Sequence, residues 1–242
     1  AKSMMAGLID FTPISSQICS IVNDSDGCKR NTYAIGFGSY LITPAHLFKY
    51  NNGELTIRSS RGVYKIRNSV DVKLHPMQRR DMVIMQLLKD FPPFPRKLKF
   101  SQPDRAMRVC LVGVNFQQNY SSCTVSESSV IAPKGNSDFW EHWITTSDGH
   151  CGLPLVDVKD KLIVGIHSLT STNGNTNFFV AIPDRFGEYL NEIVATNKWE
   201  KAWKYNPNLI SWCGLNLVES APQGLFKTAK LIEDLLDDVQ EQ

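Results

Sequence analysis

The run Asp148-Gly149-His150-Cys151-Gly152 places a cysteine close between two glycines. Glycine lets the backbone turn sharply, so that consecutive N–H groups can point at one spot. That spot suits the oxyanion of a tetrahedral intermediate beside the thiol that forms it, and the candidate donors are the N–H groups of Gly149 and Cys151. The alternative is an inert core cysteine, which is the common fate of a buried thiol.

A general base and a group to orient it have candidates upstream of Cys151. An alternating strand is expected to break at Thr43-Pro44, so His46 should lie in a short turn at the rim of that strand. Asp81 opens an apolar run, and a carboxylate at the mouth of a buried strand must be paired. The alternatives are a histidine satisfied by local backbone and a surface ion pair of Asp81 with its arginine neighbours.

The chain order His46, Asp81, Cys151 is the order of the chymotrypsin-like triad, with cysteine in place of serine. In such a triad the thiolate attacks the acyl carbon. The imidazole takes the thiol proton and later gives it to the leaving amine, while the carboxylate fixes the imidazole tautomer. A neighbouring imidazolium also raises the thiolate fraction. The three residues together predict nucleophilic catalysis by a cysteine.

Motifs spread over nearly the whole chain carry a resemblance to a known family. They occupy residues 11–16, 35–38, 46–48, 51–57, 89–95, 115–117, 139–144 and 148–152. Through them the sequence resembles the nuclear inclusion protein a proteases of potyviruses, the family of the tobacco etch virus protease. The resemblance implies a two-barrel chymotrypsin-like fold and a cysteine endopeptidase that cuts the viral polyprotein after Gln, with its triad on His46, Asp81 and Cys151.

Composition limits the other classes of function. The 242 residues are 42% apolar, which is enough for one domain or two small ones. The net charge is +2 and no basic block marks a dedicated nucleic-acid surface. Two alternatives stay open: an RNA-binding accessory protein on a peptidase fold, with only scattered Lys and Arg in support, and an inactive scaffold that binds polyprotein segments without cutting them.

Cysteine and histidine spacing argues against disulfides, metals and cofactors. The sequence shows no charged-then-apolar leader and no C-x-x-C pair, so its six cysteines are expected to be reduced thiols. The cysteines and histidines lack the paired spacing of zinc ligands, so no zinc site is expected. No motif implies a cofactor. No apolar run is long enough for a membrane span. The expected location is the cytoplasm and nucleus of the host cell.

Short alternating segments bounded by turn signals predict an all-β protein. The expected strands are 32–43, 53–59, 62–68, 81–88, 108–116, 121–132, 140–146, 153–158, 161–168 and 177–182. A proline-rich stretch at 91–95 indicates a crossing between two lobes. Helical spacing over 184–203 and 222–242 predicts short helices and a helical C-terminal tail.

This pattern divides the chain into three parts. Residues 1–100 are expected to form an N-terminal barrel with the His and Asp. Residues 101–205 should form a C-terminal barrel with the Cys, and 206–242 a C-terminal extension. The site would then lie between two lobes, where sites are common.

A peptidase that selects Gln needs a neutral donor for the side-chain carbonyl, and His167 is the candidate, with a satisfied core histidine as the alternative. Thr146 could add a hydroxyl, and the resemblance adds Asp148. Further candidates for substrate contacts are Ser168, Asn175, Asn177, Phe139 and Trp212. For the asparagines the alternative is loop solubility, and for the aromatics it is core packing.

The chain ends Val239-Gln240-Glu241-Gln242. If the enzyme itself made this terminus, it records a recognition sequence of the form Val-x-Glu-Gln before a small residue. The tail is then expected to act as a substrate in cis or as a product inhibitor. The alternative is a chance ending in a common residue.

Overall fold

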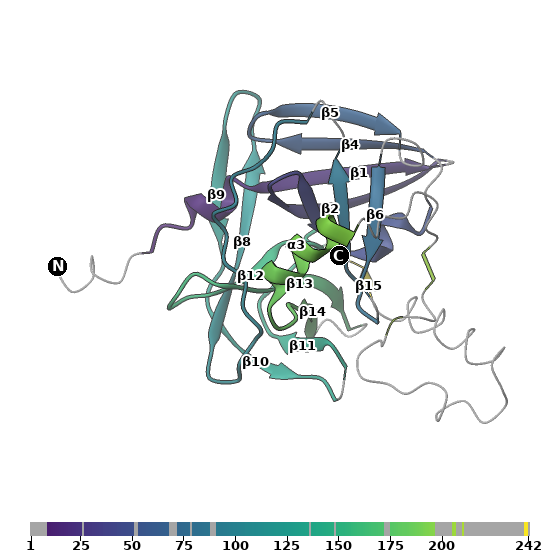
Figure 1. The fold of residues 1–242 in the computed structure, drawn as a ribbon. Coiled ribbons are helices and arrows are strands. Elements are labelled where there is room, and N and C mark those ends of the chain that lie inside the picture. Colours follow the sequence, from purple (N-terminus) through teal and green to yellow (C-terminus); the bar gives the residue numbers. More distant parts are fainter. Residues whose placement is uncertain are drawn as a thin grey trace, which may run out of the picture.

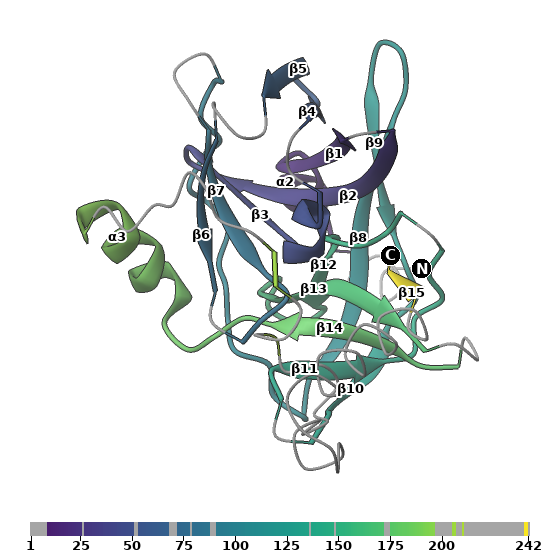
Figure 2. The same ribbon diagram turned by 90° about the vertical axis from the view of Figure 1, so that its right-hand side faces the viewer.

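The computed structural model describes residues 9–25, 27–50, 53–67, 72–77, 79–87, 91–135, 137–147, 149–171, 175–196, 205–206, 210 and 240–241. Two antiparallel sheets form two lobes, one built from the first half of the chain and one from the second (Figures 1 and 2). The all-β, two-lobe chymotrypsin-like fold predicted from the sequence is confirmed.

The first sheet has the strand order β5-β4-β1-β2-β3-β7-β6. Its strands are β1 (Ile18–Ser25), β2 (Cys28–Phe37), β3 (Tyr40–Thr43), β4 (Glu54–Ser59), β5 (Gly62–Arg67), β6 (Val72–Pro76) and β7 (Val83–Leu87). In β4, the buried positions Leu55, Ile57 and Ser59 alternate with more exposed ones, as expected for a sheet with one face on the core.

The second sheet has the order β10-β11-β14-β13-β12-β8-β9, and an additional pairing of β10 with β8 closes it into a barrel. Its strands are β8 (Arg108–Phe116), β9 (Ser121–Val125), β10 (Ser129–Pro133), β11 (Phe139–His142), β12 (Pro154–Asp157), β13 (Ile163–Thr170) and β14 (Asn177–Ala181). Every residue of β13 and β14 is buried, so these two strands form the centre of the lobe.

A two-residue strand, β15 (Gln240–Glu241), pairs with β13 in antiparallel register. Gln240 lies opposite Thr170 and Glu241 opposite Leu169. The predicted helical tail is therefore wrong for these two residues, because they complete their backbone hydrogen bonds on a sheet edge; residues 222–239 and 242 lie outside the described ranges. The helical prediction for 184–203 is met by α3 (Phe186–Thr196). Residues 184–185 form a turn before it, and residues 197–203 lie outside the described ranges.

Two of the expected strands are each two strands. The segment 32–43 turns at Gly38, whose positive φ of 59° suits glycine, so that β2 pairs with β3 as a hairpin. The segment 121–132 divides into β9 and β10, which pair with opposite ends of β8. The first sheet ends at Leu87 and the second begins at Arg108, and the predicted division at residue 100 falls between them.

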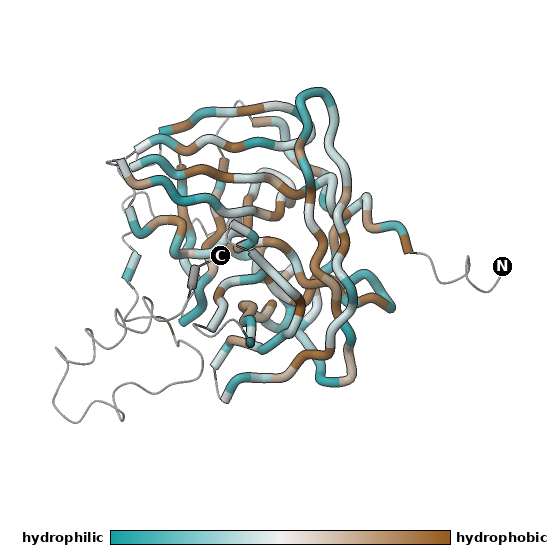
Figure 3. Tube along the Cα trace, turned by 180° about the vertical axis from the view of Figure 1, so that it is seen from behind, coloured by the Kyte–Doolittle hydropathy of each residue, from teal (hydrophilic) through white to brown (hydrophobic). Residues whose placement is uncertain are grey.

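Short helices and a hydrophilic turn complete the described fold. The helix α2 (Thr12–Ser15) packs against β8 and β9 of the other lobe, and the 3-10 helix η1 (Ala45–Phe48) follows β3. The turn that joins β8 to β9 is hydrophilic and projects past the first sheet (Figure 3).

The described ranges contain five cysteines, and all five are free thiols: Cys19, Cys28, Cys110, Cys123 and Cys151. Across those ranges no helix is both long enough and apolar enough to span a bilayer.

Candidate active site

The three candidate catalytic residues come from both lobes and meet at one point. Pro44 follows the last residue of β3 in an extended conformation, and η1 begins directly after it. His46 therefore lies just past the strand, as predicted. Asp81 lies between β6 and β7 of the same lobe, and Cys151 lies between β11 and β12 of the other. All three are buried, with exposed fractions of 2, 0 and 0%. The site therefore depends on the docking of the two lobes.

The imidazole of His46 bridges the other two residues. Its Nδ1 lies 2.6 Å from Asp81 Oδ2, and its Nε2 lies 3.2 Å from Cys151 Sγ. The His46 backbone N–H also donates to Asp81 Oδ1 at 2.9 Å, which fixes the carboxylate against the ring. A carboxylate beside Nδ1 keeps the ring proton there, so Nε2 presents its lone pair to the thiol. This arrangement can transfer the thiol proton to nitrogen and so generate a thiolate nucleophile.

Asp81 also receives a hydrogen bond from the second lobe, because Ser168 Oγ donates to its Oδ2 at 2.6 Å. Burial alone would raise the pKa of Asp81. The charge of His46 and the hydrogen bonds from His46 and Ser168 outweigh burial and hold this pKa below its ordinary value. The sequence predicts Ser168 as a substrate contact, but its hydroxyl is fully buried and faces Asp81 instead.

Since the pKa of Asp81 is lower in the folded state than its ordinary value of 3.8, this group stabilises the fold above that value. The stabilisation is lost as the pH falls through the lower, folded pKa. We expect the urea midpoint of the wild-type protein to fall as the pH drops below about 4, and that of Asp81→Asn to fall less steeply. Equal slopes for the two proteins would contradict this electrostatic account of Asp81.

The loop that carries the nucleophile is held by backbone contacts on both sides. The Tyr33 N–H of the first lobe donates to the Cys151 carbonyl at 2.7 Å, and the Gly152 N–H donates to the His167 carbonyl at 2.8 Å. The His150 N–H donates to Ser147 O at 3.2 Å. The His150 N–H is thus engaged within the loop and is not a candidate oxyanion donor. That the N–H groups of Gly149 and Cys151 stabilise the oxyanion stays a prediction.

The two glycines beside Cys151 are predicted to differ in tolerance. Both have a positive φ, 89° at Gly149 and 93° at Gly152. A Cβ at Gly152 would overlap the Tyr33 carbonyl oxygen, whereas a Cβ at Gly149 would meet no atom within 4 Å. We expect Gly152→Ala to cost about 3 kcal/mol or more of unfolding free energy, and Gly149→Ala about 1 kcal/mol from backbone strain alone. Thermal unfolding measures both, and equal losses would refute the close contact between the lobes.

The candidate residues for a Gln pocket lie beside the nucleophile loop. His167 on β13 is fully buried, and its Nδ1 lies 3.0 Å from His142 Nε2. Thr146 Oγ1 donates to Asn177 Oδ1 at 3.2 Å, and Asn177 Nδ2 donates to the Ile144 carbonyl at 2.7 Å. Asn177 is thus engaged by the protein interior, which differs from its predicted role as a substrate contact.

The other predicted contacts fall in different settings. Phe139 on β11 has no exposed surface and belongs to the hydrophobic core, so the alternative of core packing fits it. Asn175 is exposed, two residues before β14, and its contact with substrate stays a prediction. Asp148 and Trp212 lie outside the described residues.

His142 is a residue of this site that the sequence analysis does not single out. It lies on β11, directly opposite Asn177 of β14, and its ring is fully buried against His167. Burial, with His167 as a second cause, holds the pKa of His142 well below its ordinary value. A histidine within an aromatic run is typical of a core strand, so only the pairing of β11 with β14 reveals its place beside the pocket.

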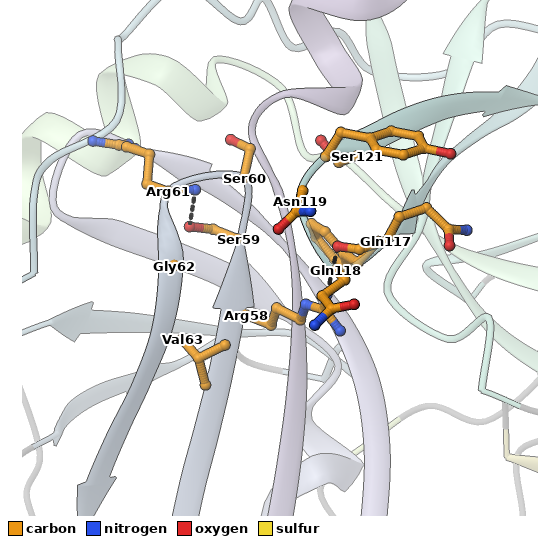
Figure 4. Close-up of a pocket in the computed structure, with 12 residues that line it drawn as sticks. Arg58, Ser59, Ser60, Arg61, Gly62, Val63, Gln117, Gln118, Asn119 and Ser121 are labelled. Carbon is orange, nitrogen blue, oxygen red and sulfur yellow. Dashed lines mark hydrogen bonds between the residues drawn. The ribbon is translucent and has the colours of Figure 1, made fainter.

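A separate pocket of about 260 Å³ lies where the β4–β5 turn of the first lobe faces the β8–β9 turn of the second (Figure 4). Arg58 reaches across it and donates to the Gln117 carbonyl at 2.9 Å (Figure 4). The pocket is lined by Arg58–Val63 and Phe116–Ser121, so none of its walls comes from the triad residues. We therefore place the candidate active site at Cys151 and regard this pocket as a contact region between two hairpins.

The site holds a cysteine that is hydrogen-bonded to a histidine–carboxylate pair, and it lies between two β lobes of chymotrypsin-like topology. This combination defines a cysteine peptidase. The sequence matches the profile of peptidase family C4 over residues 1–233. The chain belongs to that family.

Individual relatives agree with this assignment. The chain is 47% identical over 235 residues to the genome polyprotein of Turnip mosaic virus (strain Japanese). The aligned region covers 97% of this chain and 7% of that polyprotein. The structure resembles the crystal structure of tobacco vein mottling virus protease, with a TM-score of 0.82, 47% identity, and coverage of 86% of this chain and 95% of that one. It also resembles a catalytically inactive tobacco etch virus protease complexed with substrate, with a TM-score of 0.81, 43% identity, and coverage of 86% and 97%.

Proposed function

We propose that this chain is a viral cysteine endopeptidase that cleaves a polyprotein after Gln in an extended recognition sequence. The observation that carries the proposal is the continuous contact from Cys151 Sγ through the His46 ring to Asp81. The polyprotein as substrate is supported by the relatives, since this chain spans only a small part of the genome polyproteins that it matches. A relative in complex with substrate supports peptide binding at the same fold.

In this mechanism Asp81 holds the Nδ1–H of His46, and Nε2 takes the proton of Cys151. The thiolate attacks the carbonyl carbon of the Gln residue, and the N–H groups of Gly149 and Cys151 stabilise the oxyanion. The imidazolium then protonates the departing amine, which leaves a thioester. Water, deprotonated by His46, attacks that thioester and releases the carboxylic acid and the thiol.

Selection of Gln is assigned to His167 and Thr146, with Asp148 added by resemblance. A buried, neutral imidazole donates to an amide oxygen without favouring an anionic side chain, and His167 is buried beside a second histidine. The supporting geometry is that His167 and Ser168 are neighbours on β13. The carbonyl of Ser168 lies 3.3 Å from Cys151 Sγ. The pocket is therefore close to the reacting atoms.

The test is a set of peptides containing Val-Gln-Glu-Xaa followed by Ser, in which Xaa is Gln, Glu, Asn or Ala. Mass spectrometry should find cleavage after Xaa only when it is Gln, and no cleavage with Cys151→Ala. Cleavage at another residue would refute the Gln selection, and cleavage that survives Cys151→Ala would refute the nucleophile.

We also propose that the C-terminal tail binds its own active site as an extended strand. The support is the antiparallel pairing of Gln240–Glu241 with Leu169–Thr170 of β13, one residue beyond Ser168. Adding a strand to a sheet edge is a common way to bind an extended peptide, because the backbone supplies the hydrogen bonds. A bound tail would compete with substrate.

Truncation after Ser220 is therefore expected to lower the KM for the Gln peptide several-fold while leaving kcat near that of the full chain. Initial-rate kinetics of the two proteins measure the effect. A second variant is the full chain with Gln240→Pro, which removes the backbone N–H of Gln240 and disfavours the β15 pairing, so its KM should also fall. Unchanged KM in both proteins would refute inhibition by the tail.

A further inference from the structure

Two hydrogen-bond chains, one of them fully buried, start from the same residue, Ile144, and lead to His167 and Thr146 of the Gln pocket. Ile144 follows β11, and its backbone N–H and carbonyl are both engaged by side chains. One chain runs through His142 to His167, and the other runs through Asn177 to Thr146. Each chain fixes where a proton lies.

The first chain fixes the tautomers of two histidines. The Ile144 N–H donates to His142 Nδ1 at 3.2 Å, so this nitrogen is an acceptor. A neutral His142 then carries its proton on Nε2 and donates to His167 Nδ1 at 3.0 Å. His167 Nδ1 is in turn an acceptor, because an N–H there would face the N–H of His142. The proton of His167 therefore lies on Nε2, at the other side of the ring.

The second chain fixes the direction of a hydroxyl. Asn177 Nδ2 donates to the Ile144 carbonyl at 2.7 Å, which sets the orientation of its amide. Asn177 Oδ1 then accepts hydrogen bonds from Thr146 Oγ1 at 3.2 Å and from Thr170 Oγ1. A threonine hydroxyl has one proton, and that of Thr146 is used on Asn177. Towards any further group, Thr146 Oγ1 acts as an acceptor.

We propose that His142 and Asn177 are positioning residues that give the pocket one donor, His167 Nε2–H, and one acceptor, Thr146 Oγ1. A primary amide matches this pair with its carbonyl oxygen on the first and its NH₂ group on the second. A carboxylate would place an oxygen against the lone pairs of Thr146. The inference rests on the proposed selection of Gln, and it assigns these two uncharged groups a share of the discrimination of Gln from Glu, beside Asp148, which the resemblance adds to the pocket.

The first test reads the tautomers directly. Long-range ¹H–¹⁵N spectra of the folded, histidine-labelled wild-type protein should show both His142 and His167 as neutral Nε2–H rings. Assignment of His167 as an Nδ1–H ring or as an imidazolium would overturn the proposal. This measurement needs no variant, so it decides the question even where a substituted protein fails to fold.

The second test compares kcat/KM for two peptides that differ only in Gln or Glu at the cleaved position. His142→Phe removes the donor to His167 Nδ1, and Asn177→Leu removes the acceptor of the Thr146 proton. Each is expected to lower the Gln-to-Glu ratio at least about tenfold, the size of effect that follows loss of one specific hydrogen-bond partner in a buried site.

The matched control is His75→Phe, because His75 bonds to Tyr189 Oη at 2.6 Å, outside the pocket. Its Gln-to-Glu ratio should equal that of the wild type. Folded His142→Phe and Asn177→Leu proteins with unchanged ratios would refute the positioning roles. A wild-type protein that cleaves neither peptide would instead refute the proposed function itself.

Discussion

Replacement of Cys151 by alanine is expected to lower peptide turnover by about 10⁴- to 10⁶-fold, the usual cost of removing a nucleophile that acts with its base as one unit. Cys151 is the cysteine whose Sγ lies 3.2 Å from the His46 ring, and alanine has no atom that can attack a carbonyl. Rates of peptide cleavage, with circular dichroism to verify folding, measure the effect.

Cys19→Ala is the matched control for that loss. Cys19 is also completely buried, but it lies in the core of the first lobe, and burial raises the pKa of its thiol to about 12. A thiol with so high a pKa is inert at neutral pH. Turnover of Cys19→Ala should match that of the wild type. Cys151→Ala that keeps more than about 1% of wild-type turnover would refute nucleophilic catalysis by this residue.

The substitution Asp81→Asn is expected to lower kcat by about 10⁴-fold with the fold intact. Asn keeps the acceptor for the His46 N–H through Oδ1, so its NH₂ group takes the place of Oδ2 beside His46 Nδ1. That NH₂ group donates to Nδ1 and moves the ring proton to Nε2, which then points at Cys151 and cannot accept the thiol proton. Steady-state kinetics at neutral pH measure the loss.

Ser168→Ala separates this tautomer effect from general disturbance of the carboxylate. It removes the hydrogen bond to Asp81 Oδ2 but leaves the charge and both contacts of Asp81 with His46. We expect a loss of about tenfold, in proportion to one hydrogen bond to a charged group. If Asp81→Asn cost no more than Ser168→Ala, Asp81 would have no role in holding the His46 tautomer.

The triad could be predicted from the sequence because each member has a local signature. Glycines flank the loop of Cys151, a strand ends just before His46, and an apolar run follows Asp81. The partners of these residues have no such signature. Ser168 is 87 residues from Asp81, and His142 is 25 residues from His167, so only the docking of the lobes and the register of the strands bring each pair together.

Strand β1 (Ile18–Ser25) is not among the strands predicted from the sequence, and its residues show why. Its second half, with Asn23, Asp24 and Ser25, reads as polar, yet Asn23 and Ser25 are buried. Asn23 Nδ2 donates to the carbonyls of Leu47 and Tyr50, beside the turn that carries His46. A buried polar side chain that satisfies distant backbone looks like an exposed one in a hydropathy pattern.

The most direct test of the central claim is covalent labelling by a peptide in which an α,β-unsaturated ester takes the place of the Gln carboxyl group. Addition of a thiolate to its double bond forms a stable thioether, which intact-mass and fragment spectra locate. The account predicts one label per chain, on Cys151, with parallel loss of turnover, and none on Cys151→Ala. A label on Cys19, Cys28, Cys110 or Cys123 that abolishes turnover, or full turnover with Cys151 labelled, would contradict it.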